Sequence, residues 1–183
     1  MNNIARTFAR NIARRVKHLW LDASDSRRAV PPDMLARLAQ RVRASEARHT
    51  GQVRVCVEAA LPWSYVSRLS ASTTMEQLSR QRAVMLFSKL QVWDTEHSNG
   101  VLIYLLLAER TIEIVADRHL DRCVPAQEWA AMTQRMATAF RQSRFEDGLT
   151  QALEEVSALL VTHFPAVAGQ SGINELPDEP VMA

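Results

Sequence analysis

The fold of this chain is decided by the stretch from Gln91 to Leu120, which reads QVWDTEHSNGVLIYLLLAERTIEIVADRHL. From Val101 to Ala108 every residue is apolar or aromatic, which is typical of a central strand covered on both faces. A short turn, AERT, then leads into TIEIVAD, whose alternating pattern predicts a second strand. The two segments together predict an antiparallel hairpin at the centre of a sheet.

The segments on either side of this hairpin alternate between helix and strand patterns. A capping box at 73–76 predicts a helix that ends near Leu90, and the alternating segment 53–58 predicts another strand. A helix is expected from the Pro31–Pro32 pair to about His49, and two more begin near Pro125 and near Glu146. This order predicts an α/β fold, a three-layer α/β/α sandwich around a small mixed sheet.

Length and charge limit the classes of protein to which the chain can belong. With 183 residues and 47% hydrophobic side chains, it has material for one sizeable core. We expect a basic helix and linker over 1–29, one domain over 30–165 and a disordered tail over 166–183. The net charge of +2 argues against a nucleic-acid partner. No secretory signal or membrane-spanning run is recognised, which predicts a cytoplasmic protein.

Residues 1–20 have the pattern of a basic amphipathic helix. One interpretation is a terminal helix that packs its apolar residues on the domain and leaves its cations in water, and we favour it. The other is an interfacial helix that binds anionic lipid and gives the protein a peripheral membrane association. The apolar positions are Ile4, Phe8, Ile12, Val16 and Leu19, and the cations between them are Arg6, Arg10, Arg14, Arg15 and Lys17.

Oxygen-bearing side chains gather in the loop before the apolar strand. Asp94, Glu96 and Asn99 lie in this loop, and we expect Asp117 and Glu58 at the ends of neighbouring strands to converge with them. Several hard oxygen ligands at one place predict a calcium site. The alternative is that Asn99 and Gly100 only form a turn, which needs no ligand.

No catalytic motif accompanies this loop. The sequence contains no G-x-S-x-G, phosphate-binding loop or dinucleotide fingerprint, and Cys56 and Cys123 lack metal-ligand spacing. Glu46 and His49 are three residues apart near a helix end, where a cap is favoured over a metal pair.

The order of segments resembles the TPM domain family. The matching stretches are RAVMLFSKLQVWD, SNGVLIYLLLAERTIEIVADRHL and FRQSRFEDGLTQALEEVSALL, over about residues 30–163. The run Asn99–Leu102 is the most specific part, and Phe145, Gly148 and Leu149 stand at the start of the last helix. The resemblance implies an α/β/α sandwich, calcium binding at acidic loops and, in some members, a weak acid phosphatase activity.

Three functional hypotheses follow. The first is a module that binds calcium or a protein partner through the acidic loop, and we favour it. The second is a metal-assisted phosphatase, in which Asp94 or Glu96 handles the proton and Arg118 holds the anion. The third is an adaptor that reaches a membrane surface through residues 1–20.

Overall fold

The computed structural model describes residues 3–166 and 174–183, with side chains from Phe8 onward except that of Ala23. Its helices are α1 (Asn3–Trp20), α2 (Ala23–Ala29), α3 (Pro32–Glu46), α4 (Trp63–Val66), α5 (Met75–Lys89), α6 (Arg118–Cys123), α7 (Ala126–Arg141) and α8 (Phe145–His163). Its strands are β1 (Val53–Glu58), β2 (Val101–Leu106), β3 (Thr111–Ala116) and β4 (Val181–Met182).

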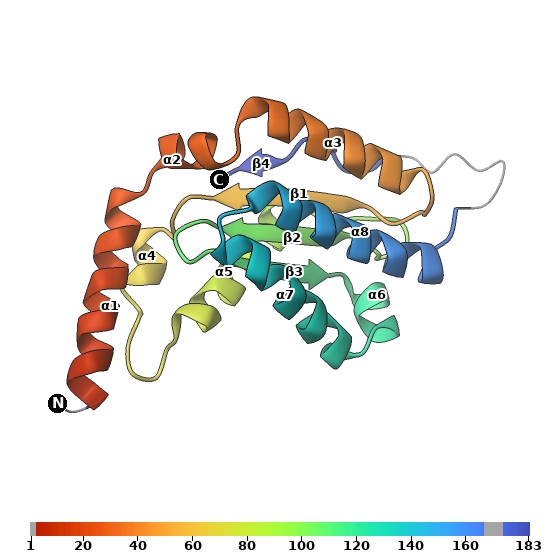
Figure 1. Cartoon of the computed structure of the whole chain (residues 1–183). Coiled ribbons are helices and arrows are strands. Elements are labelled where there is room, and N and C mark those ends of the chain that lie inside the picture. The colour runs from red at the N-terminus through yellow and green to blue at the C-terminus, as the bar shows by residue number, and fades with distance from the viewer. Residues whose placement is uncertain (1–2, 167–173) are drawn as a thin grey trace.

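The four strands form one mixed sheet in the order β3-β2-β1-β4 (Figure 1). β2 and β3 make the predicted antiparallel hairpin. β1 runs parallel to β2, with Val53 opposite Val101 and Glu58 opposite Leu106. The helix α5 lies between β1 and β2 in the chain, as the crossover of a parallel pair requires. This register fixes which residues share an end of the sheet.

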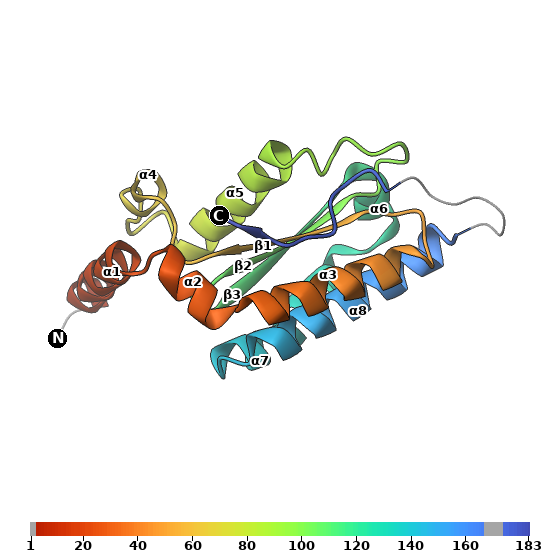
Figure 2. The same cartoon turned by 90° about the horizontal axis from the view of Figure 1, so that it is seen from above.

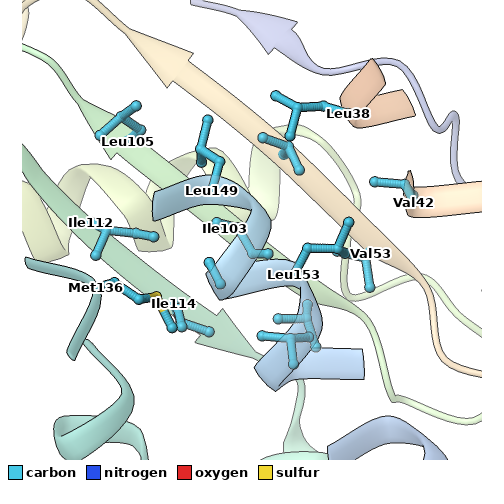
Figure 3. Close-up of a cluster of buried hydrophobic side chains, with 14 of the residues drawn as sticks. Leu38, Val42, Val53, Ile103, Leu105, Ile112, Ile114, Met136, Leu149 and Leu153 are labelled. Atoms are coloured by element: carbon cyan, nitrogen blue, oxygen red, sulfur yellow. The ribbon is translucent and has the colours of Figure 1, made fainter. Parts of the chain in front are cut away.

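Helices cover both faces of the sheet, which confirms the predicted α/β/α sandwich (Figure 2). On one face α5 packs against β2 and β3, while α7 and α8 cover the other face, with α3 packed on α8. All six side chains of β2 are buried, which explains why its sequence is continuously apolar. Figure 3 shows the cluster on the α8 face, where Leu149 and Leu153 meet Ile103 and Val53.

Several short elements were not predicted from the sequence. The helices α2, α4 and α6 have seven, four and six residues, which is too short for a helical period to show. The capping box of α5 is shifted by one residue, with Thr74 as N-cap and Gln77 as its partner. A glutamine at this position serves as well as the glutamate that the pattern suggested.

The prediction of a disordered tail needs a correction for residues 174–183. Here β4 pairs with β1, Leu176 is buried, and Arg43 holds Asp178 at 3.0 Å. The side chain of Arg54 donates to the carbonyl oxygens of Pro177 and Glu179. These partners are distant in sequence, so local composition did not show them. Residues 167–173 lie outside the described part of the chain.

The N-terminal helix forms as expected, but the favoured packing interpretation is wrong for its described side chains. α1 lies beside α4 at one end of the sheet (Figure 1). Phe8, Ile12, Val16 and Leu19 are all exposed. Among the described residues, no helix is long and apolar enough to cross a membrane.

Candidate functional site

One end of the sheet is formed by residues 92–100 together with 117–119, and we call it the loop end. It contains four of the predicted calcium-site residues, Asp94, Glu96, Asn99 and Asp117. Beyond the pair Val101–Ala116, which ends the strands β2 and β3, Asp117 N donates to Gly100 O at 2.8 Å and His119 N donates to Ser98 O at 3.1 Å. These two bonds extend the β2–β3 ladder past both strands. The predicted acidic loop and the start of α6 are therefore held side by side.

The path of the loop depends on Gly100. A Cβ atom at this position would lie 1.9 Å from the carbonyl oxygen of Val92, so only glycine fits without a shift of backbone. Val92 itself is fully buried, and its N–H donates to Phe87 O at 3.0 Å. Thr95 Oγ1 accepts a bond from Asn99 N at 3.2 Å. The chain between α5 and β2 thus folds back on itself tightly.

Asp117 is a buried acid with an unused oxygen. It is the N-cap of α6, and its Oδ1 accepts a bond from Arg118 N at 2.6 Å. Its Oδ2 is buried and has no hydrogen-bond partner among the described residues. Arg118 is exposed, with Nε at 3.8 Å from Oδ1. Buried polar oxygens nearly always accept a hydrogen bond, so we expect this oxygen to have a partner that is not among the described residues.

Asn99 has a second unused oxygen at the same end of the sheet. The residue is fully buried, and its Nδ2 donates to Thr50 Oγ1 at 3.4 Å. Its Oδ1 has no partner among the described residues. In the extended ladder Asp117 is opposite Gly100, so side-chain alternation puts Asp117 on the α5 face and Asn99 on the α8 face. The two oxygens share an end of the sheet but not a face.

Asp94 and Glu96 are exposed in the loop, which packs on the α5 face through Val92. Glu96 N donates to the carboxylate of Glu175 at 2.9 Å. Gln52 Oε1 in turn accepts bonds from Glu175 N and from the next residue's N–H. Glu175 is therefore a further carboxylate of this end, and sequence reasoning missed it because it lies in the expected tail.

The expectation that Glu58 joins these residues is wrong. Glu58 is at the carboxyl end of β1, opposite Leu106, whereas Asn99 precedes the amino end of β2. The seven-residue offset from Asn99 to Leu106 therefore separates them, by about 23 Å at 3.3 Å per residue. Glu58 is instead held by Arg82, through Nε at 3.0 Å and Nη2 at 2.5 Å, and by the hydroxyl of Tyr104 at 2.6 Å.

The pair Glu46 and His49 makes structural contacts, but His49 is not the helix cap that we favoured, since the C-cap of α3 is Ala47. His49 Nδ1 contacts Gly51 O at 3.0 Å and its Nε2 contacts Ser45 Oγ at 2.8 Å, so both ring nitrogens are used. Burial lowers the pKa of His49 to about 4 and raises that of Glu46 to about 8. His49 therefore has no ring nitrogen left for a metal ion, while one oxygen of Glu46 accepts a bond from the N–H of the first residue of β1.

A separate hollow of about 320 Å³ lies between α5, β3 and α7, at the Thr111 end of β3. Burial raises the pKa of Glu113 in its wall to about 7. Ser79 Oγ and Thr111 Oγ1, also in its wall, are buried without a partner among the described residues. None of the predicted site residues lines it.

The ligand atoms at the loop end determine which kinds of metal ion could bind there. Among the described residues, no group of three or more His, Cys, Asp or Glu side chains is placed to hold a metal ion. A zinc site of nitrogen and sulfur ligands is thus unsupported in that part of the chain. The Oδ2 of Asp117, which has no partner among the described residues, is a hard oxygen ligand of the kind that calcium and magnesium prefer.

Comparisons with known proteins agree with this fold. The model of the TPM domain matches residues 24–159, close to the 30–165 expected for the domain. Comparison with the curated proteins gives no match. Among solved structures, the NMR structure of the BA42 protein from the psychrophilic bacterium Bizionia argentinensis is similar, with a TM-score of 0.69 and 23% identity. The alignment covers 84% of this chain and 95% of BA42. The chain belongs to the TPM domain family.

Proposed function

We propose that this TPM domain binds a divalent cation, calcium in the first place, at the loop end with Asp117 as the central ligand. The observation that carries the proposal is the buried Oδ2 of Asp117, which has no partner among the described residues. Leaving a buried acceptor unpaired costs about 1–3 kcal/mol, and more for a charged group. A bound cation would remove that cost.

The remaining ligands come from the same face. The loop that carries Asp94 and Glu96 packs on the α5 face, where the register also puts Asp117. Glu175 reaches this loop through its bond from Glu96 N. Calcium accepts carboxylate, carbonyl and water oxygens together, which such a set can provide. Bound calcium would offset the charge of Asp117 and link the loop to the start of α6.

We expect weak binding, because no cluster of three acidic or histidine ligands is preformed in the described chain. Sites with few charged ligands and a flexible shell bind calcium with Kd values of roughly 10⁻⁴–10⁻³ M. Asn99 keeps a free oxygen as well, but on the other face. Its replacement by alanine should therefore weaken binding less than a change at Asp117.

The test is a calorimetric calcium titration of the chelator-treated protein beside Asp117→Asn. The asparagine can still cap α6, so the variant removes the charge and leaves the backbone in place. Asp121→Asn is the matched control, since Asp121 is an exposed acid one turn further along α6. Binding that is kept in Asp121→Asn and lost in Asp117→Asn supports the site. Equal binding in all three proteins, or no heat with the unmodified chain, contradicts it.

The same samples separate a binding module from an enzyme. A phosphatase would use the cation to polarise a phosphoryl oxygen, and exposed Arg118 is placed beside Asp117 to hold the anion. Hydrolysis of an aryl phosphate that needs calcium and falls in Arg118→Gln would support that activity. We expect calcium binding without turnover, and that result would identify a cation-binding module. A protein partner would be a further ligand of the same loop.

A further inference from the structure

The helix α1 turns its apolar side chains away from the domain. Among its described side chains, the five large apolar ones are between 44% and 81% exposed, and we call them the α1 stripe: Phe8, Ile12, Val16, Leu19 and Trp20. Their spacing places them on one side of the helix. A helix that packs on the core of a soluble domain normally buries such a stripe. In α1 the stripe is exposed, and the opposite, polar side of the helix contacts the domain.

The polar side of α1 makes the attachment. Arg14 Nε lies 3.2 Å from Glu109, and Arg15 Nη2 donates to Leu69 O at 2.7 Å. His18 is buried, with its Nε2 at 3.2 Å from the same carboxylate of Glu109 and its Nδ1 accepting a bond from Leu61 N at 3.0 Å. These contacts reach the β2–β3 turn and the loop around α4. They fix which way the stripe faces.

The positive charge of α1 indicates which kind of surface the α1 stripe can bind. Residues 1–21 contain no Asp or Glu, and the exposed cation Lys17 lies one turn from Trp20 of the stripe, with exposed Arg10 on the same flank of the helix toward its polar side. An apolar face bordered by cations fits a surface that is apolar within and negatively charged at its boundary. A second copy of this chain fits less well, because its stripe is bordered by the same cations.

We propose that α1 binds the surface of a membrane containing anionic phospholipids, with the α1 stripe inserted among the acyl chains and Arg10 and Lys17 at the headgroups. Trp20, the most exposed of the five, stands at the end of the stripe next to the domain. Tryptophan side chains concentrate at this boundary between lipid and water. The domain would then lie on the membrane with its loop end directed away, since α1 and α6 are at opposite ends of the sheet (Figure 1).

The experiment is sedimentation of the full chain with vesicles of phosphatidylcholine alone or mixed equally with phosphatidylglycerol. We expect binding to the mixed vesicles and little to the neutral ones. Ile12→Glu/Val16→Glu should lower the partition coefficient about tenfold or more, because two inserted side chains become charged. Arg10→Glu/Lys17→Glu should also lower it about tenfold or more, since each cation near an anionic surface contributes about fivefold.

The control variant is Val84→Glu, which puts a charge on an exposed apolar residue of α5, outside both α1 and the loop end. It should bind as the unmodified chain does. Quenching of fluorescence by brominated lipid should be strong and should fall in Trp20→Phe. Equal binding of Ile12→Glu/Val16→Glu and the unmodified chain would overturn the proposal. So would a lipid-independent dimer that this variant dissolves, because the stripe would then be covered by a second copy.

Discussion

Each end of the sheet contains a buried acid, and the two acids differ in how many hydrogen bonds their carboxylate oxygens accept. Glu58 and Asp117 have the same exposed fraction, 3%. At one end Glu58 receives two bonds from Arg82 and one from Tyr104. At the other, Asp117 receives one bond from a backbone N–H, and its second oxygen has no partner among the described residues. Burial alone therefore does not distinguish the two acids, whereas the pairing of their oxygens does.

The largest effect is expected where the satisfied end is broken. Arg82→Ala leaves the charge of Glu58 buried without a cation, which should lower the free energy of unfolding by about 3–5 kcal/mol. Burial and the negative charge of Glu58 both raise the pKa of Tyr104, so its hydroxyl stays protonated and cannot replace the cation. Urea denaturation followed by circular dichroism measures the change.

Arg82 lies over the ring of Tyr65, 5.5 Å from its centroid, and exposed Arg68 lies over the same ring at 4.4 Å. Arg68→Ala is therefore the control for Arg82→Ala. It should change stability by less than about 1 kcal/mol. The double variant Glu58→Gln/Arg82→Met should be less destabilised than the sum of its single changes. Additive changes would mean that Glu58 and Arg82 are not energetically coupled.

The next effect concerns the backbone of the loop end. Gly100→Ala forces a Cβ against the carbonyl oxygen of Val92, and a backbone atom cannot move aside as a side chain can. We expect a loss of about 1–3 kcal/mol and weaker calcium binding, because the loop shifts relative to Asp117. Gly51→Ala is the comparison, since its Cβ would meet the flexible end of Leu160. A smaller loss at Gly100 than at Gly51 would contradict this account.

A smaller effect should appear at the unsatisfied end without metal. Asp117→Asn removes a buried charge with a free oxygen and keeps the cap, so the metal-free variant should be within about 1 kcal/mol of the unmodified chain, or more stable. Glu58→Gln should be clearly destabilising, because it leaves Arg82 without its charge partner. Thermal melts in chelator compare the two. Similar losses in both variants would remove the distinction between the ends.

Much of the sheet could be predicted from the sequence. The position of Glu58 could also have been predicted, from the parallel pairing of β1 and β2. The apolar run at Val101 and the alternation after it predicted β2 and β3 because period and burial are local properties. The predicted helix between β1 and β2 already implied a parallel pair. In such a pair the carboxyl ends coincide, which puts Glu58 beside Leu106 and away from Asn99.

Other features of the site could not be predicted because they depend on contacts between distant segments. β4 has two residues and exists only through its pairing with β1. Glu175 reaches the loop through bonds to Gln52 and Glu96, which no local pattern records. The direction of the α1 stripe likewise depends on Glu109 and Leu69, far along the chain. A helical period predicts an apolar side but not what covers it.

The smallest effect concerns Glu46, a half-buried acid in the last turn of α3. It accepts a bond from Val53 N at 2.8 Å, and burial, with Asp178 nearby, raises its pKa to about 8 from 4.5. Because the folded state holds this proton more tightly than the unfolded state, stability should fall as pH rises from about 4.5 to about 8 and then level off. The effect is reduced by the partial exposure of the side chain.

Melting temperatures measured between about pH 7 and about pH 9 cover the upper part of the Glu46 transition. His49, with its pKa lowered to about 4, loses stability only as the pH falls below about 6.5, but Glu113, with its pKa raised to about 7, also contributes near pH 7. The Glu46 contribution is therefore the difference between the unmodified chain and Glu46→Gln. Glu46→Gln keeps an acceptor for Val53 N and carries no charge, so its melting temperature should decline less over this range. Glu154→Gln, at an exposed acid of α8, should decline as the unmodified chain does. Parallel curves for all three would contradict a raised pKa of Glu46 in the folded protein.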